Sequence, residues 1–425
     1  MLRTARVSGT RIAGRAAGRL LAAAGVVLAL TVLPLLPAST ASADSVRDQQ
    51  LWVLDMLHAP DAWGITAGSG VTVAVIDSGV DRNVSDLTGS VTDGPDYTGV
   101  NTPPSNPNWG EHGTWMASII AGHGHDFEGL DGITGIAPAA HILSIRVIPD
   151  KGDPGYQAYN NEPEEHIQDE LADGIRYAVK AHAKVISMSI GYSAPSGVVR
   201  AAIQYAYSHG VVLVASSGNS GDNDTQHGGS GSSLAPVSFP AEYPGVVSVG
   251  AVTRDGNATS FSSGNLSVRV AAPGKGVPAE GRNGLYYTVD GTSPACALVA
   301  GVAALLEARY PSITPAQVTQ ALTGTAQQTP AGSYDVLTGF GIVNADAALV
   351  KAGELMKEHA KGSQVSLSSH FGGGAAAVPA APVTPRGHGW LMALVVVALV
   401  SGAALAGGIA GLARTRERGK RRHAA

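Results

Sequence analysis

From residue 71 onwards, short runs rich in β-branched residues alternate with longer stretches whose apolar residues recur at helical spacing. Four of the short runs are bounded by turn residues and are predicted to be buried strands, namely 71–76, 141–148, 185–190 and 211–215. Helices are predicted at 112–121, 164–183, 197–208, 294–309 and 344–351. This alternation is typical of an α/β protein in which helices flank a mainly parallel central sheet.

Three short, glycine-containing segments supply an Asp, a His and a Ser. Asp77 follows the first predicted strand, His112 begins a predicted helix, and Ser293 directly precedes the long apolar helix. A serine hydroxyl is a weak nucleophile until an imidazole can take its proton, and a carboxylate must hold that imidazole in the right tautomer. A helix N-terminus next to the serine would also stabilise a developing oxyanion. The three segments therefore predict a nucleophilic serine site.

The order Asp, His, Ser along the chain is the order found in subtilisins. On the segments 75–79, 111–114 and 290–295, the chain resembles a subtilisin-like serine peptidase over residues 71–349. The resemblance implies a subtilisin-like three-layer fold with a mainly parallel sheet. It also implies that Asp77 orients the imidazole, that His112 is the general base and then the general acid, and that Ser293 is the nucleophile. The chain departs from the family pattern after this serine, where Pro294 replaces the usual methionine or other bulky apolar residue.

Two further segments resemble the parts of subtilisins that bind substrate. Asn219 ends a segment that follows a predicted strand, and the resemblance implies that its side chain completes the oxyanion hole, although a simple turn asparagine is the alternative. The segment 189–191 resembles the stretch that pairs with an extended substrate backbone through main-chain hydrogen bonds. The residues expected to bind the substrate are Ser189, Ile190, Gly191, Ser217 and Gly218.

No cofactor and no required metal are expected. Many subtilisins bind calcium in the loop after the histidine helix, but here that loop, residues 123–132, is rebuilt. Its His123 and His125 are interpreted as surface or packing residues, because no further ligands follow at matching spacing. The single cysteine, Cys296, excludes an intramolecular disulfide and is expected to be a small buried apolar residue rather than a second nucleophile. A second insertion, residues 149–163, is either a loop that controls access to the site or solvated decoration.

The two ends of the chain differ in composition from its middle. Residues 1–43 combine five arginines, an apolar stretch and a small-residue cleavage motif, so we predict a signal peptide, with an uncleaved anchor as the alternative. Residues 390–412 form an uncharged apolar run long enough to cross a bilayer, so a transmembrane helix is predicted and a core helix is the alternative. The basic residues 413–425 predict a cytoplasmic tail. The formal net charge is +5 at each end and −5 for the whole chain, so the residues between the two ends carry −15. This negative charge argues against a nucleic-acid partner.

The middle of the chain is predicted to hold a short N-terminal arm (44–70) packed on a peptidase domain (71–355), followed by a flexible Gly/Ala/Pro-rich stalk (361–388). The whole order of parts resembles the mycosins, membrane-anchored proteases associated with type VII secretion in actinobacteria. This resemblance implies a single-pass cell-membrane protein whose catalytic domain is extracytoplasmic. Its substrates would be exported polypeptides and its partner the type VII secretion machinery. Mycosins often carry cysteine pairs, which this chain lacks.

Two other functions fit the same sequence. The folded domain could serve mainly as a structural component that stabilises a secretion complex, with proteolysis secondary, since a catalytic site and a docking surface can coexist on one fold. A general digestive protease is disfavoured, because the predicted anchor would keep the enzyme at the cell surface.

Overall fold

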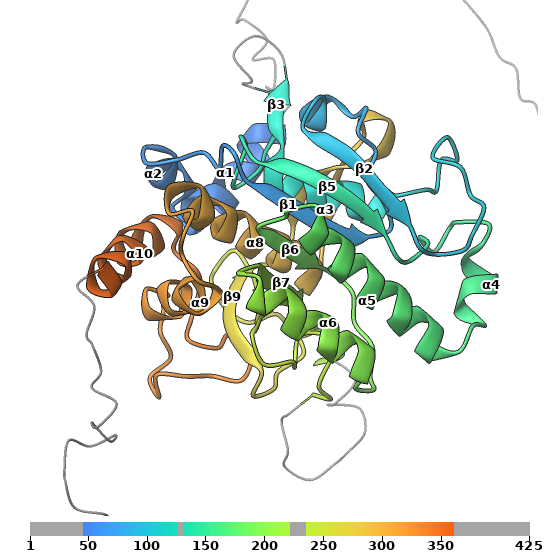
Figure 1. The fold of residues 1–425 in the computed structure, drawn as a ribbon. Coiled ribbons are helices and arrows are strands. Elements are labelled where there is room, and N and C mark those ends of the chain that lie inside the picture. Colours follow the sequence, from blue (N-terminus) through green and yellow to red (C-terminus); the bar gives the residue numbers. More distant parts are fainter. Residues whose placement is uncertain (1–45, 126–130, 222–234, 361–425) are drawn as a thin grey trace, which may run out of the picture. The chain divides into compact units, whose positions relative to one another are not determined.

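A seven-stranded sheet forms the centre of the protein (Figure 1). The computed structural model describes residues 46–125, 131–221 and 235–360, all of which belong to the first of two compact units, Met1–Lys361. The strand order is β2-β5-β1-β6-β7-β8-β9, and every neighbouring pair is parallel. In chain order the strands are β1 (Thr72–Asp77), β2 (Val91–Asp96), β5 (His141–Arg146), β6 (Val185–Met188), β7 (Val212–Ser216), β8 (Val246–Val252) and β9 (Val268–Pro273).

The four strands predicted from the sequence are present as β1, β5, β6 and β7. All four lie inside the sheet, where parallel strands are covered on both faces and so consist of nearly continuous apolar runs. The edge strand β2 was not predicted, because it carries Asp93 and Asp96 and is partly exposed along its length. The strands β8 and β9 were not predicted either, although β8 is buried at all seven positions.

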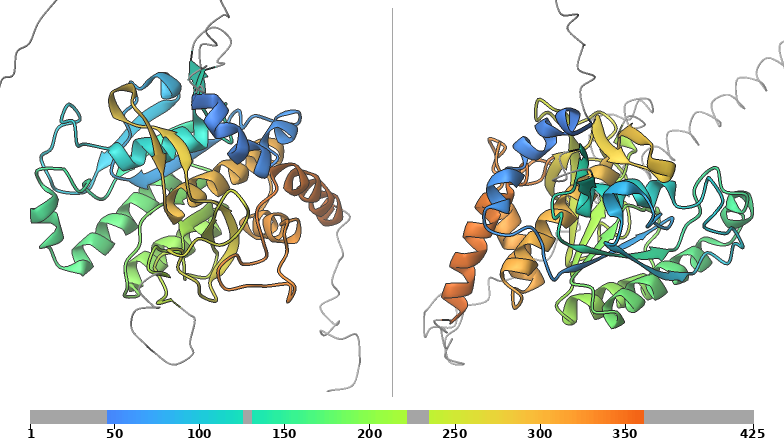
Figure 2. Two further views of the ribbon diagram at one scale, coloured as in Figure 1. Left: turned by 180° about the vertical axis from the view of Figure 1, so that it is seen from behind. Right: turned by 90° about the horizontal axis from the view of Figure 1, so that it is seen from above.

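Helices cover both faces of the sheet (Figures 1 and 2). The helices α5 (Glu164–Lys180) and α6 (Gly197–Ser208) pack on one face, and α3 (Glu111–Ala121) and α8 (Thr292–Arg309) pack on the other. Side chains of β1 alternate between the two layers, since Val73 and Val75 face the α3 and α8 side. This arrangement is the three-layer α/β fold that the sequence predicts.

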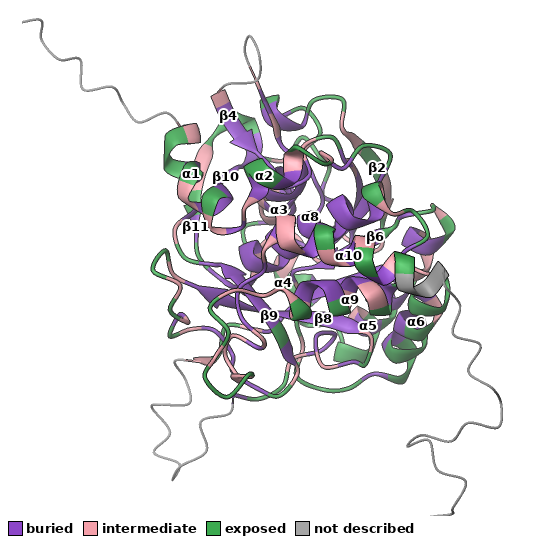
Figure 3. Cartoon of the chain, turned by 90° about the vertical axis from the view of Figure 1, so that its left-hand side faces the viewer, coloured by how far each residue is buried: buried purple, intermediate pink, exposed green. Residues whose placement is uncertain are grey.

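The helix α8 runs through the core and is buried along almost its whole length (Figure 3). In the described part of the chain it is the one helix long and apolar enough to cross a membrane, and 83% of it is buried inside the protein. It begins at Thr292, two residues before the predicted start at Pro294. Proline is nevertheless tolerated there, because the first four N–H groups of a helix have no partner within it. The predicted membrane helix at 390–412 lies outside the described residues, as do segments 1–43, 361–388 and 413–425.

The N-terminal stretch of the described residues packs on the rest of the fold. It contains α1 (Val46–Met56) and α2 (Ala59–Trp63). The Gln50 amide exchanges two hydrogen bonds with the backbone of Thr134, and the Trp63 indole donates to the carbonyl of Ile136. The remaining elements are η1 (Ser85–Leu87), α4 (Tyr156–Asn160), η3 (Arg282–Gly284), α9 (Pro315–Gly324), α10 (Ala345–Ala360) and the antiparallel hairpins β3 (His123–His125) with β4 (Asp131–Thr134) and β10 (Val277–Glu280) with β11 (Tyr286–Val289).

Candidate active site

Asp77 and His112, which lie 35 residues apart in the sequence, are hydrogen-bonded in the structure. Asp77 is the last residue of β1, and His112 is the second residue of α3. Oδ1 of Asp77 lies 2.8 Å from Nδ1 of His112, and the carboxylate is 1% exposed while the imidazole is 28% exposed. Because an ionised carboxylate can only accept, it holds Nδ1 as the donor and leaves Nε2 free to accept a proton.

The close approach of α3 to β1 depends on Gly113. A Cβ atom at this position would lie 2.1 Å from the carbonyl oxygen of Gly79 and 3.3 Å from the Cβ of Asp77. The N–H of Gly113 also donates to Oγ of Ser78, at 3.0 Å. Any larger residue at position 113 would therefore push His112 away from Asp77.

The pKa of His112 is raised above the ordinary value of histidine. Burial lowers it, but the charge and hydrogen bond of Asp77 and the charge of Asp150 outweigh burial and stabilise the imidazolium. The neutral imidazole, which is the form that can act as a base, therefore predominates only above this raised pKa. A reaction that uses His112 as a base should be lost as the pH falls through this raised pKa.

The start of α8 meets the ends of β6 and β7. Ser293 is half-buried at the second position of α8, and its carbonyl accepts a hydrogen bond from Oγ of Ser189 at 3.2 Å. Oδ1 of Asn219, which follows β7, accepts from both the backbone N–H and the hydroxyl of Thr292, each at 2.9 Å. Both bonds use the oxygen of the amide, so they orient the exposed Asn219 side chain and leave its Nδ2 group as an available donor.

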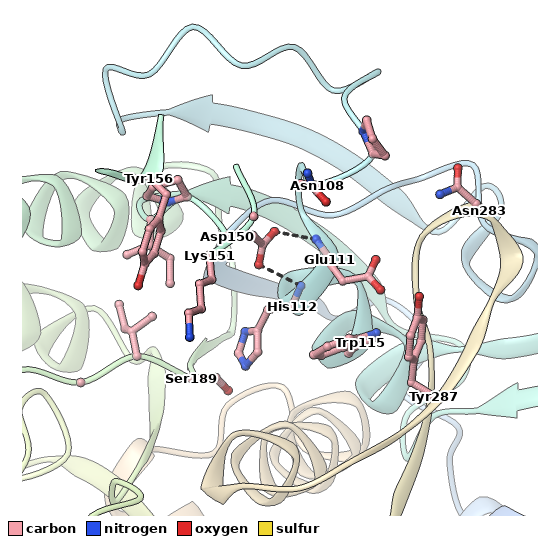
Figure 4. Close-up of a pocket in the computed structure, with 16 residues that line it drawn as sticks. Asn108, Glu111, His112, Trp115, Asp150, Lys151, Tyr156, Ser189, Asn283 and Tyr287 are labelled. Atoms are coloured by element: carbon pink, nitrogen blue, oxygen red, sulfur yellow. Dashed lines mark hydrogen bonds between the residues drawn. The ribbon is translucent and has the colours of Figure 1, made fainter. Parts of the chain in front are cut away.

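A cavity of about 640 Å³ lies beside this meeting point (Figure 4). Three of the five predicted substrate-binding residues, 189–191, line it together with His112. Ser217 and Gly218 are not among the lining residues, and the Ser217 side chain is fully buried. The Gly218 N–H instead donates to the hydroxyl of Thr292, at 3.3 Å.

The walls of this cavity also contain residues that the sequence did not single out. The segment 149–163, for which decoration remained an alternative, contributes part of the wall. On the opposite side, Trp115 and Tyr287 pack against each other with their ring centroids 5.2 Å apart. The wall residues that the sequence did not single out as site residues include Glu111, Trp115, Asp150, Lys151, Tyr156 and Tyr287.

Two other candidate reactive side chains are accounted for by packing. Cys296 is fully buried in α8, and burial raises the pKa of its thiol to about 11, so it is the inert apolar residue that was expected. His125 pairs with the buried carboxylate of Asp86, at 2.7 Å. Within residues 46–125, 131–221 and 235–360, no group of three or more His, Cys, Asp or Glu side chains is placed to hold a metal ion.

Comparison with known proteins assigns the fold to a family. Residues 68–359 match the model of the subtilase family. Thermitase from Thermoactinomyces vulgaris is 36% identical over 250 residues, which cover 59% of this chain and 79% of thermitase. Subtilisin E from Bacillus subtilis (strain 168) is 34% identical over 281 residues, which cover 66% of each chain. The chain belongs to the subtilase family, and it is a serine peptidase with the subtilisin-like fold.

Among solved structures, mycosins are similar to this chain. MycP1 from Mycobacterium smegmatis has 30% sequence identity and a TM-score of 0.58, covering 70% of this chain and 84% of that one. The MycP3 protease from the type VII (ESX-3) secretion system has 31% identity and a TM-score of 0.57, covering 70% of this chain and 87% of that one. The resemblance to mycosins expected from the order of parts is thus confirmed for the peptidase domain.

Proposed function

We propose that this subtilase is an endopeptidase whose catalytic triad is Asp77, His112 and Ser293. The observation that carries the proposal is the 2.8 Å bond between a fully buried carboxylate and an imidazole that lines the cavity. Support comes from the hydrogen bond between Ser189 and the Ser293 carbonyl, because it joins the start of α8 to the residues that line the same cavity.

In this mechanism, Oγ of Ser293 attacks the scissile carbonyl while Nε2 of His112 takes its proton, and Asp77 stabilises the resulting imidazolium. The oxyanion accepts hydrogen bonds from Nδ2 of Asn219 and from the backbone N–H of Ser293, which lies in the first turn of α8. The C–N bond then breaks as His112 protonates the leaving amine. Water deprotonated by His112 attacks the acyl-enzyme ester, and the reverse proton transfer releases the acid and restores Ser293.

The substrate backbone is proposed to add as an extended strand to residues 189–191, which follow the end of β6 and line the cavity. Main-chain hydrogen bonds of this kind give affinity for many sequences. Ser217 and Gly218 are proposed to border the pocket before the scissile bond through their backbone, since the Ser217 side chain is buried.

The proposed setting is the outer face of a cell membrane, with exported proteins as substrates. Support comes from the similarity to mycosins, of which MycP3 is a protease from a type VII secretion system, and from the apolar run at 390–412 followed by a basic tail. In this arrangement residues 1–43 are a signal peptide, 44–70 an arm, 71–355 the peptidase domain, 361–388 a stalk and 413–425 a cytoplasmic tail.

One experiment tests both the chemistry and the setting. Intact cells that express the full chain or its Ser293→Ala variant are treated with a membrane-impermeant fluorophosphonate and then fractionated. We expect labelling of the unmodified protein alone, and we expect the labelled protein to sediment with membranes. Equal labelling of both proteins would remove Ser293 from the mechanism, and labelling only after lysis would contradict the extracytoplasmic setting.

A second experiment tests the alternative role. If a Ser293→Ala strain secretes normally while a deletion strain does not, the protein acts mainly as a structural component.

A further inference from the structure

The helix that carries His112 has an unusual beginning. Its N-cap residue is Gly110, which has a left-handed backbone (φ 72°, ψ 26°) and no side chain that could accept a hydrogen bond. The first N–H groups of a helix have no partner within it and normally require a nearby acceptor. In this protein the acceptor comes from another part of the chain.

Asp150, in the segment after β5, supplies that acceptor with both of its carboxylate oxygens. Oδ2 accepts from the backbone N–H of Glu111 at 2.7 Å, and Oδ1 accepts from the backbone N–H of His112 at 3.2 Å (Figure 4). The carboxylate thus lies against the positive end of the α3 dipole, where a negative charge is stabilised. One of the two backbone groups that it holds belongs to His112 itself.

The segment that carries Asp150 is itself firmly anchored. The carboxylate of Asp153, which is fully buried, pairs with Nη2 of Arg146 at 2.8 Å. Nε of the same arginine donates to the carbonyl oxygen of Ser78, the residue after Asp77, at 3.0 Å. The hydroxyl of Tyr159 donates to the carbonyl of Val147 at 2.6 Å. The segment is therefore linked to the Asp77 loop through Arg146, and it is bonded directly to the start of the His112 helix.

We propose that Asp150 is a positioning residue for catalysis, which fixes the start of α3 and places a second negative charge beside the imidazole of His112. This inference rests on the catalytic role of His112 proposed above. It assigns a function to segment 149–163, in which Asp150 supports the reacting groups from the wall of the cavity. The segment thus has a role beyond decoration.

The charges around the imidazole define what the removal of Asp150 should do. The charged groups near the imidazole are Asp77, which is hydrogen-bonded to it from the end of β1, and Asp150, Lys151 and Glu111, which line the cavity together with it. Of these, Asp77 and Asp150 raise the pKa of His112 against the effect of burial. Loss of the Asp150 charge should therefore lower the pKa of His112 and extend activity to lower pH.

The test compares the full chain with its Asp150→Asn variant, with the second-order rate constant of fluorophosphonate labelling measured across pH. Asparagine has nearly the same shape, but it is uncharged and has one acceptor oxygen instead of two. We expect the acid limb to move down by about half a pH unit, the order of size expected when one nearby unit charge acts through a high dielectric. We expect the rate constant on the plateau to fall about 3- to 10-fold, as for the loss of one hydrogen bond.

The matched control is Glu165→Gln, which removes the same charge from an exposed position on α5. Its acid limb should stay within about 0.1 unit of that of the unmodified protein, because solvent screens exposed charges. A fall in the melting temperature of the Asp150→Asn variant without a shift of its acid limb would reduce Asp150 to a structural helix cap and overturn the proposal.

A second measurement does not depend on activity. The imidazole of His112 is titrated by NMR with histidine labelled at Cε1, in Ser293→Ala protein with and without Asp150→Asn. A titration midpoint that is equal in the two proteins would also overturn the proposal. If instead Ser293→Ala protein keeps full labelling, the triad itself is wrong, so failure of the triad and failure of the Asp150 inference give different results.

Discussion

Two carboxylate–imidazole pairs in this protein are almost identical in distance and in exposure. Asp77 and His112 approach to 2.8 Å, and Asp86 and His125 approach to 2.7 Å, in both cases between Oδ1 and Nδ1. The carboxylates are 1% and 0% exposed, and the imidazoles are 28% and 29% exposed. A buried Asp that orients a half-exposed His is therefore not sufficient to define a catalytic site.

The two pairs differ in what surrounds them. Oδ2 of Asp86 accepts from the backbone N–H of Ile133 at 2.6 Å and from the hydroxyl of Tyr286 at 3.1 Å, so this carboxylate joins η1 to both hairpins. Oδ2 of Asp77 has no hydrogen-bond partner among the described residues. His112 lines the 640 Å³ cavity, whereas His125 is not among the residues of its wall. We infer that Asp77 and His112 are arranged for catalysis, whereas Asp86 and His125 hold η1 and the two hairpins together.

The largest difference between the pairs should appear when each carboxylate is replaced by its amide. In Asp77→Asn, the amide can no longer hold His112 in the tautomer that accepts a proton at Nε2, and we expect the fluorophosphonate labelling rate to fall about 10⁴-fold, as in other triads. In Asp86→Asn, we expect a change of less than about 3-fold, because His125 lies outside the mechanism, together with a loss of about 1–3 kcal/mol in the free energy of unfolding.

Labelling rates and urea unfolding of the two purified variants measure both effects. The functional distinction between the pairs would be wrong if Asp86→Asn lost as much labelling as Asp77→Asn while it remained folded. It would also be wrong if Asp77→Asn affected only stability.

A second feature that sets the Asp77–His112 pair apart is the proposed oxyanion donor Asn219 beside Ser293. Thr292, at the start of α8, orients the Asn219 side chain. In Asn219→Leu, the oxyanion loses one hydrogen bond, and we expect kcat for a peptide p-nitroanilide to fall about 10²- to 10³-fold with little change in KM. The control is Asn108→Leu, which changes an exposed asparagine in the wall of the same cavity. If the two variants lost equal activity, Asn219 would have no special role as a donor.

The sequence located the parts of the first pair, because each lies in a local segment. The interior strands β1, β5, β6 and β7 were predictable for a similar reason, since burial on both faces gives them nearly continuous apolar runs. The edge strand β2, with its exposed Asp93, carries no such pattern. The start of α8 was placed two residues late, because proline is acceptable at several positions of a first turn and does not mark one of them.

Asp150 and the Asp86–His125 pair could not be predicted in this way. Asp150 bonds to backbone N–H groups 38 and 39 residues earlier in the chain, and a backbone donor has no sequence signature. His125 was interpreted as a surface or packing residue, and its partner lies 39 residues away in η1. Such contacts are set by the tertiary fold, which brings together residues without any local motif.

The smallest expected effect concerns pH. A change of pH should affect activity through the Asp77–His112 pair, and stability through Glu280, which lies next to the Asp86–His125 pair. Glu280, whose side chain accepts from the backbone N–H groups of Ser85 and Asp86, is fully buried. Burial and the charge of Asp86 raise the pKa of Glu280 to about 7 from an ordinary value of 4.5. The folded state therefore binds this proton more tightly than the unfolded state. The free energy of unfolding should then fall by up to about 3 kcal/mol as the pH rises from 4.5 to 7.

In Glu280→Gln this contribution disappears, because the amide does not titrate. Urea unfolding at pH 5 and pH 7.5 should show a loss of stability in the unmodified protein that is about 1–3 kcal/mol larger than in the variant. His112 and Glu307 also have raised pKa values, so their contributions to stability also fall as the pH rises. Both groups are present in the two proteins, so these contributions cancel in the comparison. An equal pH dependence in the two proteins would mean that Glu280 keeps its charge throughout. The stability of the contacts around Asp86 would then not depend on protonation of Glu280 in this pH range.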